Sequence, residues 1–217
     1  EASFRALDMV INGRGAVRDA HPAPHYRWLD DPEALTALLA GAQLAALDTE
    51  TTPTGELFCF SVSCAPGEAV VCPPSLLPVA VAALKHSTVV LHNAAFDLVV
   101  MEKTGAHLER FEDTLLMAHA LQLPQLGLKP LARRWCGMRM ANIHDGAPGA
   151  DVTKMERGAL VDYSARDADA TLRLYPALLA ADLRPVQKPQ GAYYVMCDIS
   201  RFGFATDTEF ARWLITQ

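Results

Sequence analysis

The stretch LAALDTET, from Leu44 to Thr51, joins an apolar run to two acids that are separated by one residue. An apolar run of this length predicts a buried strand. Because side chains alternate between the two faces of a strand, Asp48 and Glu50 are expected to point to the same side. Two carboxylates held together on a rigid strand repel each other unless a cation lies between them. A strand end whose acids simply meet water is the alternative, and the other motifs decide between the two.

The segments around this stretch predict an α/β domain. Short apolar runs bounded by turn residues predict strands over 44–50, 57–64, 68–72 and 88–93. Helical spacing and capping residues predict helices over 30–41, 94–105, 112–122, 128–137 and 155–183. Because strands come first and helices predominate later, we expect a mixed central β-sheet flanked by α-helices.

The composition is that of an ordinary globular protein, with 51% hydrophobic and 20% charged residues among 217. No apolar stretch is long enough to cross a bilayer, and the N-terminus lacks the apolar core of a signal peptide. The five cysteines lack metal-binding spacing, so we expect reduced thiols in a cytoplasmic protein. We also expect a monomer that binds no membrane. The formal net charge of −6 argues against a broad basic surface for nucleic acid, but not against a site where metal ions supply positive charge.

A second acid follows the strand predicted over 88–93, in LHNAAFDLVVM. Asn93 occupies a natural N-cap position, and Asp97 lies four residues later on the same helix face. An acid one turn into a helix after a buried strand lies at the carboxyl edge of the sheet, where ligand sites form. The alternative is a capping asparagine followed by an acid that favours the helix dipole.

A third motif, DYSARDADAT, places Tyr163 and Asp167 four residues apart on one helix face. Asp162 and Asp169 lie on other faces of the same helix. A solvated acidic face is the alternative, but a tyrosine one turn before an inward aspartate is more specific. The phenol can hold a water or a scissile oxygen while the carboxylate holds a metal.

Together these motifs supply four acids, Asp48, Glu50, Asp97 and Asp167. Their convergence on one point would be costly without cations, because unpaired buried charges are strongly disfavoured. Oxygen ligands favour Mg²⁺ or Mn²⁺, whereas zinc usually brings His or Cys. Two such ions, about 3.5–4 Å apart, can serve phosphodiester hydrolysis. The sequence therefore predicts a site for two divalent cations.

The stretches LDTET, HNAAFD and YSARDADAT resemble, in order, the three motifs of the DEDDy 3′–5′ exonucleases. They are most similar to the proofreading domain of family A DNA polymerases, the polymerase I type, including phage versions. FEDTLLMAHAL and GLKPLARRW are similar to the part of that family between the second and third motifs. The resemblance implies an RNase H-like fold and hydrolysis of 3′-terminal phosphodiesters of DNA that releases nucleoside 5′-monophosphates.

The resemblance also implies roles for individual residues. One divalent cation would be held by Asp48, Glu50 and Asp167, and a second by Asp48 and Asp97. Tyr163, together with Glu50, would orient the attacking water. Substrate contacts would come from residues within the first two motifs: Thr49, Thr51, Asn93 and Phe96.

The same resemblance divides the chain into segments. Residues 1–25 would be an N-terminal extension or linker, and residues 26–185 the exonuclease domain. Residues 186–217 would form a helical segment leading toward a polymerase region that the sequence lacks, since ISRFGFATDTEFARWL is similar to that junction. The expected partners are a single-stranded or frayed 3′ end of DNA and, in a longer chain, a C-terminal polymerase domain. The expected location is the cytoplasm of a bacterium or a phage-infected host, and the loop over 140–153 has no assigned role.

Two other functions stay open. A ribonuclease D-like RNA 3′–5′ exonuclease shares the acids and the tyrosine, although DTETTPTG lacks the aromatic residue that often follows the acid pair there. A catalytically silent module that binds nucleic-acid ends is disfavoured because all five motif residues are present. The low basicity predicts weak DNA binding, with Lys129, Arg133 and Arg134 as candidates for phosphate contacts. An exposed helix face is the alternative interpretation of these three residues. For His92, beside the second motif, we expect a structural role with a backbone partner.

Overall fold

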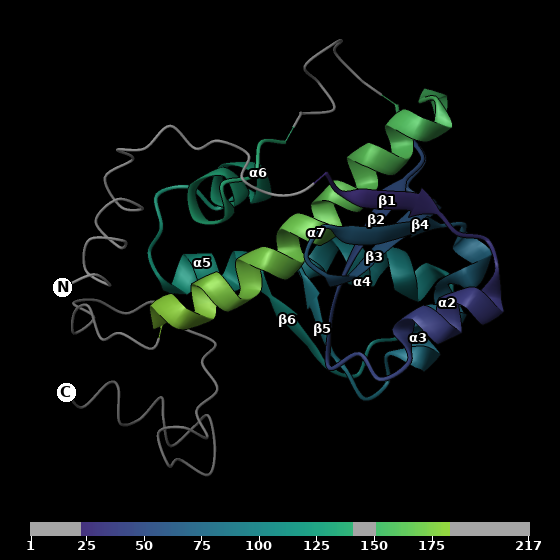
Figure 1. The fold of residues 1–217 in the computed structure, drawn as a ribbon, viewed down its shortest axis with the longest axis horizontal. Helices are drawn as coiled ribbons and strands as arrows, with labels where there is room; N and C mark the ends of the chain where they lie inside the picture. The colour runs from purple at the N-terminus through teal and green to yellow at the C-terminus, as the bar shows by residue number, and fades with distance from the viewer. Residues whose placement is uncertain (1–22, 141–150, 183–217) are drawn as a thin grey trace. The chain divides into compact units, whose positions relative to one another are not determined.

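The computed structural model describes residues 23–140 and 151–182 and contains a six-stranded mixed sheet (Figure 1). The strands are β1 (His25–Trp28), β2 (Leu44–Thr51), β3 (Leu57–Ala65), β4 (Glu68–Cys72), β5 (Thr88–Leu91) and β6 (Phe111–Asp113). Their order across the sheet is β1-β4-β3-β2-β5-β6. β3 runs antiparallel to its neighbours β2 and β4, and the other neighbouring strands pair in parallel.

Helices cover both faces of this sheet. The α-helices are α2 (Pro32–Leu39), α3 (Leu77–Ala83), α4 (Ala94–Lys103), α5 (Thr114–Ala120), α6 (Leu128–Leu131) and α7 (Arg157–Asp182). Shorter turns are the 3-10 segments Pro74–Leu76 and Val152–Lys154 and the π-helical segment Ala132–Cys136. α2, α3 and α4 pack on one face, and the long α7 crosses the other. α5 and α6 pack against the second half of α7.

The alternation of β2 sets this two-sided arrangement. Leu47 packs with the core of the α2–α4 face, whereas Ala46 packs with Leu172 of α7. Residues 48 and 50 share the parity of Ala46, so the strand directs both of its acids toward α7. Ala165 and Ala168 of α7 are fully buried. Their small side chains let the helix approach the sheet closely.

The fold confirms the expected RNase H-like α/β architecture with a mixed sheet and flanking helices. The strands predicted over 44–50, 57–64 and 68–72 each agree to within one residue, and the strand predicted over 88–93 ends earlier, at Leu91. The helix predicted over 155–183 is a single element with Pro176 inside it. In the helix predicted over 30–41, Asp31 caps α2 by accepting hydrogen bonds from the backbone N–H groups of Glu33 and Ala34.

Three sequence predictions differ from the structure. β1 is a strand that the sequence analysis missed, and its first residue, His25, ends the segment interpreted as an extension or linker. β6 lies at the start of the helix predicted over 112–122. The helix predicted over 128–137 is only α6, one turn long, followed by the π-helical segment. Both missed strands are short and lie at the two edges of the sheet, where a half-exposed strand shows little apolar pattern.

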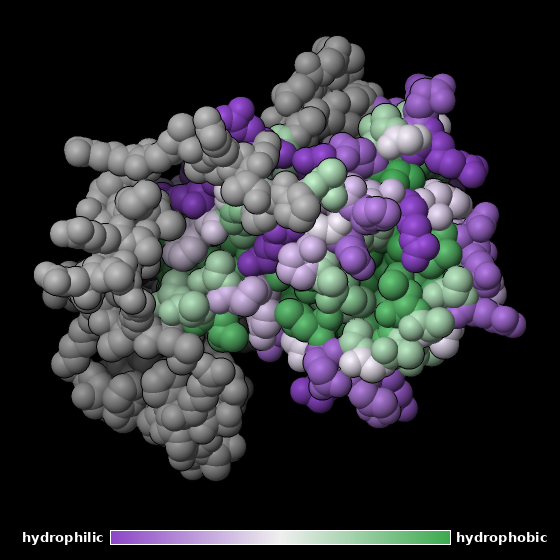
Figure 2. All heavy atoms as spheres, in the orientation of Figure 1, coloured by the Kyte–Doolittle hydropathy of each residue, from purple (hydrophilic) through white to green (hydrophobic). Residues whose placement is uncertain are grey.

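Several predictions concern segments outside the described residues: the N-terminal extension, most of the loop over 140–153, Cys197 and the C-terminal helical segment. Cys59, Cys64, Cys72 and Cys136 are free thiols, as expected. No helix among the described residues has both the length and the apolarity needed to cross a membrane. On the face drawn in Figure 2, hydrophilic residues line the upper and right-hand margin of the described part, and hydrophobic residues show in patches between them.

Candidate active site

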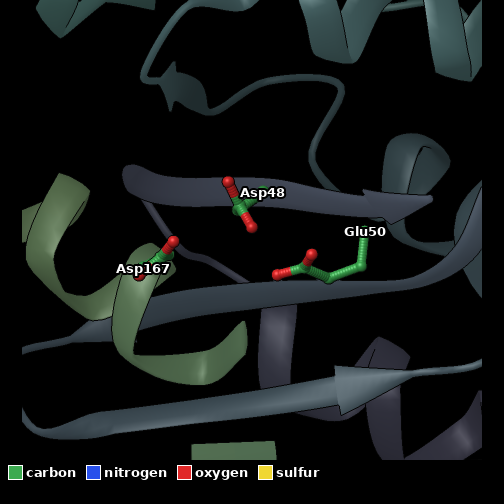
Figure 3. Close-up of side chains that lie close together, drawn as sticks. All are labelled: Asp48, Glu50 and Asp167. Atoms are coloured by element: carbon green, nitrogen blue, oxygen red, sulfur yellow. The ribbon is translucent and has the colours of Figure 1, made fainter. Parts of the chain in front are cut away.

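Three carboxylates meet between β2 and α7 (Figure 3). Asp48 and Glu50 come from the second half of β2, and Asp167 comes from the middle of α7. One ligand oxygen of each lies within 4.8 Å of those of the other two. Asp48 and Glu50 therefore point to the same side of β2, and Asp167 faces them from α7, as the sequence predicts.

Three hydrogen bonds fix α7, and with it Asp167, on the sheet. The hydroxyl of Ser61 in β3 donates to the backbone carbonyl of Ser164 at 2.8 Å. Two residues beyond Asp167, Asp169 accepts hydrogen bonds at Oδ2 from the hydroxyl of Tyr26 in β1 at 2.6 Å and at Oδ1 from the N–H of Gly67 at 2.9 Å. Asp169 also pairs with Arg173 at 2.7 Å. The acidic residue that faces away from the site thus anchors the helix that carries it.

The fourth acid, Asp97 in α4, lies beside the trio. Its carboxyl is 2% exposed, and its Oδ1 accepts hydrogen bonds from the backbone N–H of Thr49 at 3.0 Å and the Thr49 hydroxyl at 2.6 Å. Asp97 does not belong to the group within 4.8 Å, but its charge contributes to the raised pKa of Asp48. Thr49 faces α4 while its neighbours in sequence face α7. The structure therefore gives it a contact with Asp97, and its predicted substrate contact stays a prediction.

Burial raises the pKa of every acid in the site, and repulsion by the other carboxylates adds to this at Asp48 and Glu50. Burial, followed by the charge of Asp167, raises the pKa of Glu50 to about 8. Burial raises the pKa of Asp97 and of Asp167 to about 6, and the Thr49 hydrogen bonds act against this at Asp97. Asp48 has a pKa well above its usual range because of burial, then Glu50, Asp97 and Asp167. Oxygen donors that repel one another at this range fit a hard divalent cation.

Tyr163 lies one helical turn before Asp167 and is half-buried. Burial, followed by the charges of Glu50, Asp167 and Asp48, raises the pKa of its phenol. The phenol is therefore neutral at physiological pH and can donate a hydrogen bond. The Nζ atom of Lys129 in α6 lies 4.9 Å from the centroid of the ring.

The segment before α4 departs from the expected cap. Asn93 occupies the N-cap position but has a left-handed backbone with φ of 71°, and its side chain makes no capping hydrogen bond. Asp113 caps the helix instead, because its two carboxylate oxygens accept from the backbone N–H groups of Asn93 at 3.0 Å and Ala94 at 2.9 Å. The side-chain cap predicted for Asn93 is thus wrong. The Asn93 side chain is exposed.

Asp113 is a residue that the sequence analysis missed. It also caps α5, since its Oδ1 accepts from the backbone N–H of Leu115 at 2.8 Å. One buried carboxylate therefore holds the first turns of two helices, including the one that carries Asp97. An acid followed by threonine at the start of a helical pattern is a capping signal. The sequence does not reveal that the same acid caps a second helix.

The remaining predicted residues lie around the trio. Thr51 is half-buried at the end of β2, next to an irregularity in its pairing with β3. Phe96 in α4 is 48% exposed. His92 shares a 2.9 Å hydrogen bond with the Thr114 hydroxyl, and the backbone of Leu126 is a second partner of its ring, as expected. Burial lowers the pKa of His92, so this histidine is a neutral structural group.

The sequence and this site together define a class of protein. The family model described as 3′–5′ exonuclease matches residues 26–181, and the chain belongs to this family. It is therefore a metal-dependent nuclease of the DEDD type, a hydrolase with an acidic metal centre. No curated protein matches the chain.

Solved structures share its fold. The catalytic core of RRP6 from Trypanosoma brucei has a TM-score of 0.61 and 17% identity, covering 77% of this chain and 52% of that one. The chain thus spans about half of that core. NrnC from Brucella melitensis has a TM-score of 0.58 and 18% identity over 90% of this chain and 91% of that one. The Nibbler EXO domain from Aedes aegypti has a TM-score of 0.58 and 14% identity over 71% and 87%.

Proposed function

We propose that this exonuclease removes nucleotides from a single-stranded or frayed 3′ end of DNA, in the cytoplasm, as nucleoside 5′-monophosphates. The observation that carries the proposal is the approach of Asp48, Glu50 and Asp167 to within 4.8 Å in a member of the 3′–5′ exonuclease family. The resemblance of its three motifs to those of polymerase proofreading domains supports DNA as the substrate. A structure of NrnC with pGG bound supports a nucleic-acid end as the ligand class.

Two divalent cations fit the donor set of this site. Asp48, Glu50 and Asp167 would hold one cation, and Asp48 and Asp97 the other. When bound, they would supply the positive charge that activates a water and stabilises the leaving oxygen. A structure of NrnC with bound Mg²⁺ supports this choice of ion.

The protein's own groups would position the reactants. Glu50 would accept a hydrogen bond from the attacking water, and the neutral phenol of Tyr163 would donate one to hold that water or the scissile phosphate in line. Thr49 keeps Asp97 in place through two hydrogen bonds. Thr51, Asn93 and Phe96 would contact the terminal nucleotide.

An RNA 3′ end is the second candidate substrate, because the acids and the tyrosine suit either sugar. Degradation of a 5′-labelled single-stranded DNA and a matched RNA separates the two. With Mg²⁺ or Mn²⁺ we expect a ladder that shortens from the 3′ end of DNA, with little cleavage of RNA and none in EDTA. A faster ladder on RNA would assign the ribonuclease function instead.

A pair of variants on α4 supplies the control. Asp97→Ala should abolish the ladder, whereas Glu102→Gln removes an exposed acid from the same helix and should leave it intact. If the wild-type protein binds a 3′ end but cleaves neither nucleic acid with any divalent metal, it is a silent binding module. That result would reject the proposed hydrolysis.

A further inference from the structure

Lys129 lies in the one-turn helix α6, beside the candidate active site. Its Nζ atom is 4.9 Å from the centroid of the Tyr163 ring. Its positive charge lowers the pKa of Asp48, Glu50 and Asp167, against the larger effect of burial. The ring that the ammonium contacts belongs to the residue one helical turn before Asp167, so the ammonium lies beside the clustered acids.

The protein itself does not neutralise this ammonium. Within residues 23–140 and 151–182, the Lys129 side chain makes no ion pair and no hydrogen bond. Its ammonium makes a cation–π contact with the Tyr163 ring. An ammonium carries three N–H donors and no acceptor. All three donors are therefore available to an anion that enters the site.

We propose that Lys129 binds the scissile phosphate of the substrate, while the ring of Tyr163 holds its ammonium in position. The inference rests on the exonuclease function proposed above and adds a substrate-binding residue to it. The face of an aromatic ring attracts a cation without using its N–H donors. The lysine is thus fixed in place and can still reach a phosphate oxygen.

The negative charge of the whole protein favours a cationic residue at the point where the substrate binds. The net charge is −6, and four acids surround the point where a phosphate must bind. Bound metal ions neutralise part of this charge, and a lysine beside them attracts the substrate further. Arg133 and Arg134, the other phosphate contacts predicted from the sequence, are exposed on the following π-helical segment. Among the described residues, the cation in contact with the Tyr163 ring is Lys129 and not either of these two arginines.

Steady-state kinetics on a 5′-labelled single-stranded oligonucleotide, over a range of NaCl concentrations, test this contact. Lys129→Met removes the charge and keeps the apolar stem, and Lys129→Arg restores the charge. Lys85→Met removes an exposed lysine from the turn between α3 and β5 as the matched control. For Lys129→Met we expect kcat/KM to fall at least tenfold. Log KM should also depend less steeply on log salt, by about 0.7, which is the value for one phosphate contact on a single strand.

The two conservative changes sharpen the test. Lys129→Arg should recover most of kcat/KM and the wild-type salt dependence, because a guanidinium also binds phosphate and also stacks on a ring. Tyr163→Phe should lower kcat but keep the salt dependence, since the ring remains. Tyr163→Leu should lower kcat and also reduce the salt dependence, because the ring that holds the ammonium is gone.

Several outcomes would overturn the inference. One is a Lys129→Met protein whose kcat/KM and salt dependence match those of Lys85→Met. Another is a Lys129→Met protein that binds Mn²⁺ more tightly by calorimetry with an unchanged salt dependence, because the lysine would then act on the carboxylates alone. If the wild-type protein degrades no nucleic acid, the proposed function fails instead, and this result is distinct from a wild-type enzyme that is insensitive to the variant.

Discussion

At the scale of single residues, Thr49 is the residue that ties the first motif to the second. It lies between two acids that face α7, yet its own hydroxyl and N–H both bind Asp97 on the opposite face of the strand. A residue that orients a metal ligand without touching the metal is commonly as necessary as the ligand. We therefore expect the hydroxyl of Thr49 to matter for catalysis.

Replacing Thr49 by valine tests this role because valine keeps the shape of the side chain and removes the hydroxyl. Asp97 would retain only the backbone N–H, so we expect a fall in activity of about tenfold or more and a weaker affinity for Mn²⁺. The lost buried hydrogen bond should cost about 1–2 kcal/mol of unfolding free energy. Nuclease assays and urea unfolding measure the two effects. Thr36→Val, which removes an exposed hydroxyl bond within α2, should leave the activity unchanged.

The raised pKa of Glu50 predicts how stability changes with pH in EDTA. Its pKa is about 8 in the folded protein against 4.5 ordinarily, so the folded state keeps a proton that the unfolded chain has released. Rising pH between these two values therefore lowers the free energy of unfolding. Urea unfolding at pH 5 to 8 should show this decline, and Glu50→Gln should show a shallower one. A steeper decline in the variant would contradict the prediction.

At the scale of elements, two helices depend on one acid. Asp113 ends β6 and accepts the N–H groups at the start of both α4 and α5. The packing of α4 against the sheet alone would not fix the depth of its first turn, on which Asp97 stands. The cap fixes this depth, because the N–H groups of Asn93 and Ala94 both donate to the carboxylate of Asp113.

Removal of this cap should therefore affect both stability and activity. We expect Asp113→Ala to cost about 2 kcal/mol, the sum of two helix caps, and to lower nuclease activity as Asp97 shifts. Asp31→Ala, which removes the cap of α2, should cost about 1 kcal/mol and leave the activity unchanged. Unfolding midpoints and DNA degradation rates measure the two effects. Equal loss of activity in both variants would show that the effect at Asp113 is only a general loss of stability.

At the scale of the whole molecule, the acidic site opposes folding until a cation binds. Three half-buried carboxyls lie close together, and the charges of Glu50 and Asp167 act on Asp48, so Asp48→Asn should raise the unfolding temperature in EDTA even though it removes a predicted metal ligand. Mg²⁺ or Mn²⁺ should stabilise the wild-type protein and have little effect on the variant. Thermal unfolding with and without metal, together with the nuclease assay, shows whether stability and activity change in opposite directions.

The sequence predicts the parts of this molecule that follow a local period. The two-residue period of β2 places Asp48 and Glu50 on one face, and the four-residue spacing in α7 places Tyr163 and Asp167 on one face. The resemblance of the motifs, and not these periods, predicts that the two faces meet. The edge strands β1 and β6 could not be predicted, because strands of three or four half-polar residues form only through pairing with a distant neighbour. The same applies to Asp113, whose second helix is known only from the tertiary fold.

The two-sided use of β2 has a consequence for how this chain can vary in length. Leu47 and Thr49 serve one face of the sheet, and Ala46, Asp48 and Glu50 serve the other. Inserting or deleting one residue within this strand would turn every following side chain to the opposite face and exchange Thr49 with the acids. The turn between β3 and β4 contacts α7 through the N–H of Gly67, which donates to Oδ1 of Asp169 at 2.9 Å, but a change of length in a loop does not turn the acids of β2 to the other face. Natural variants of this chain should therefore differ in loop length around the sheet and keep the spacing within residues 44–51 unchanged.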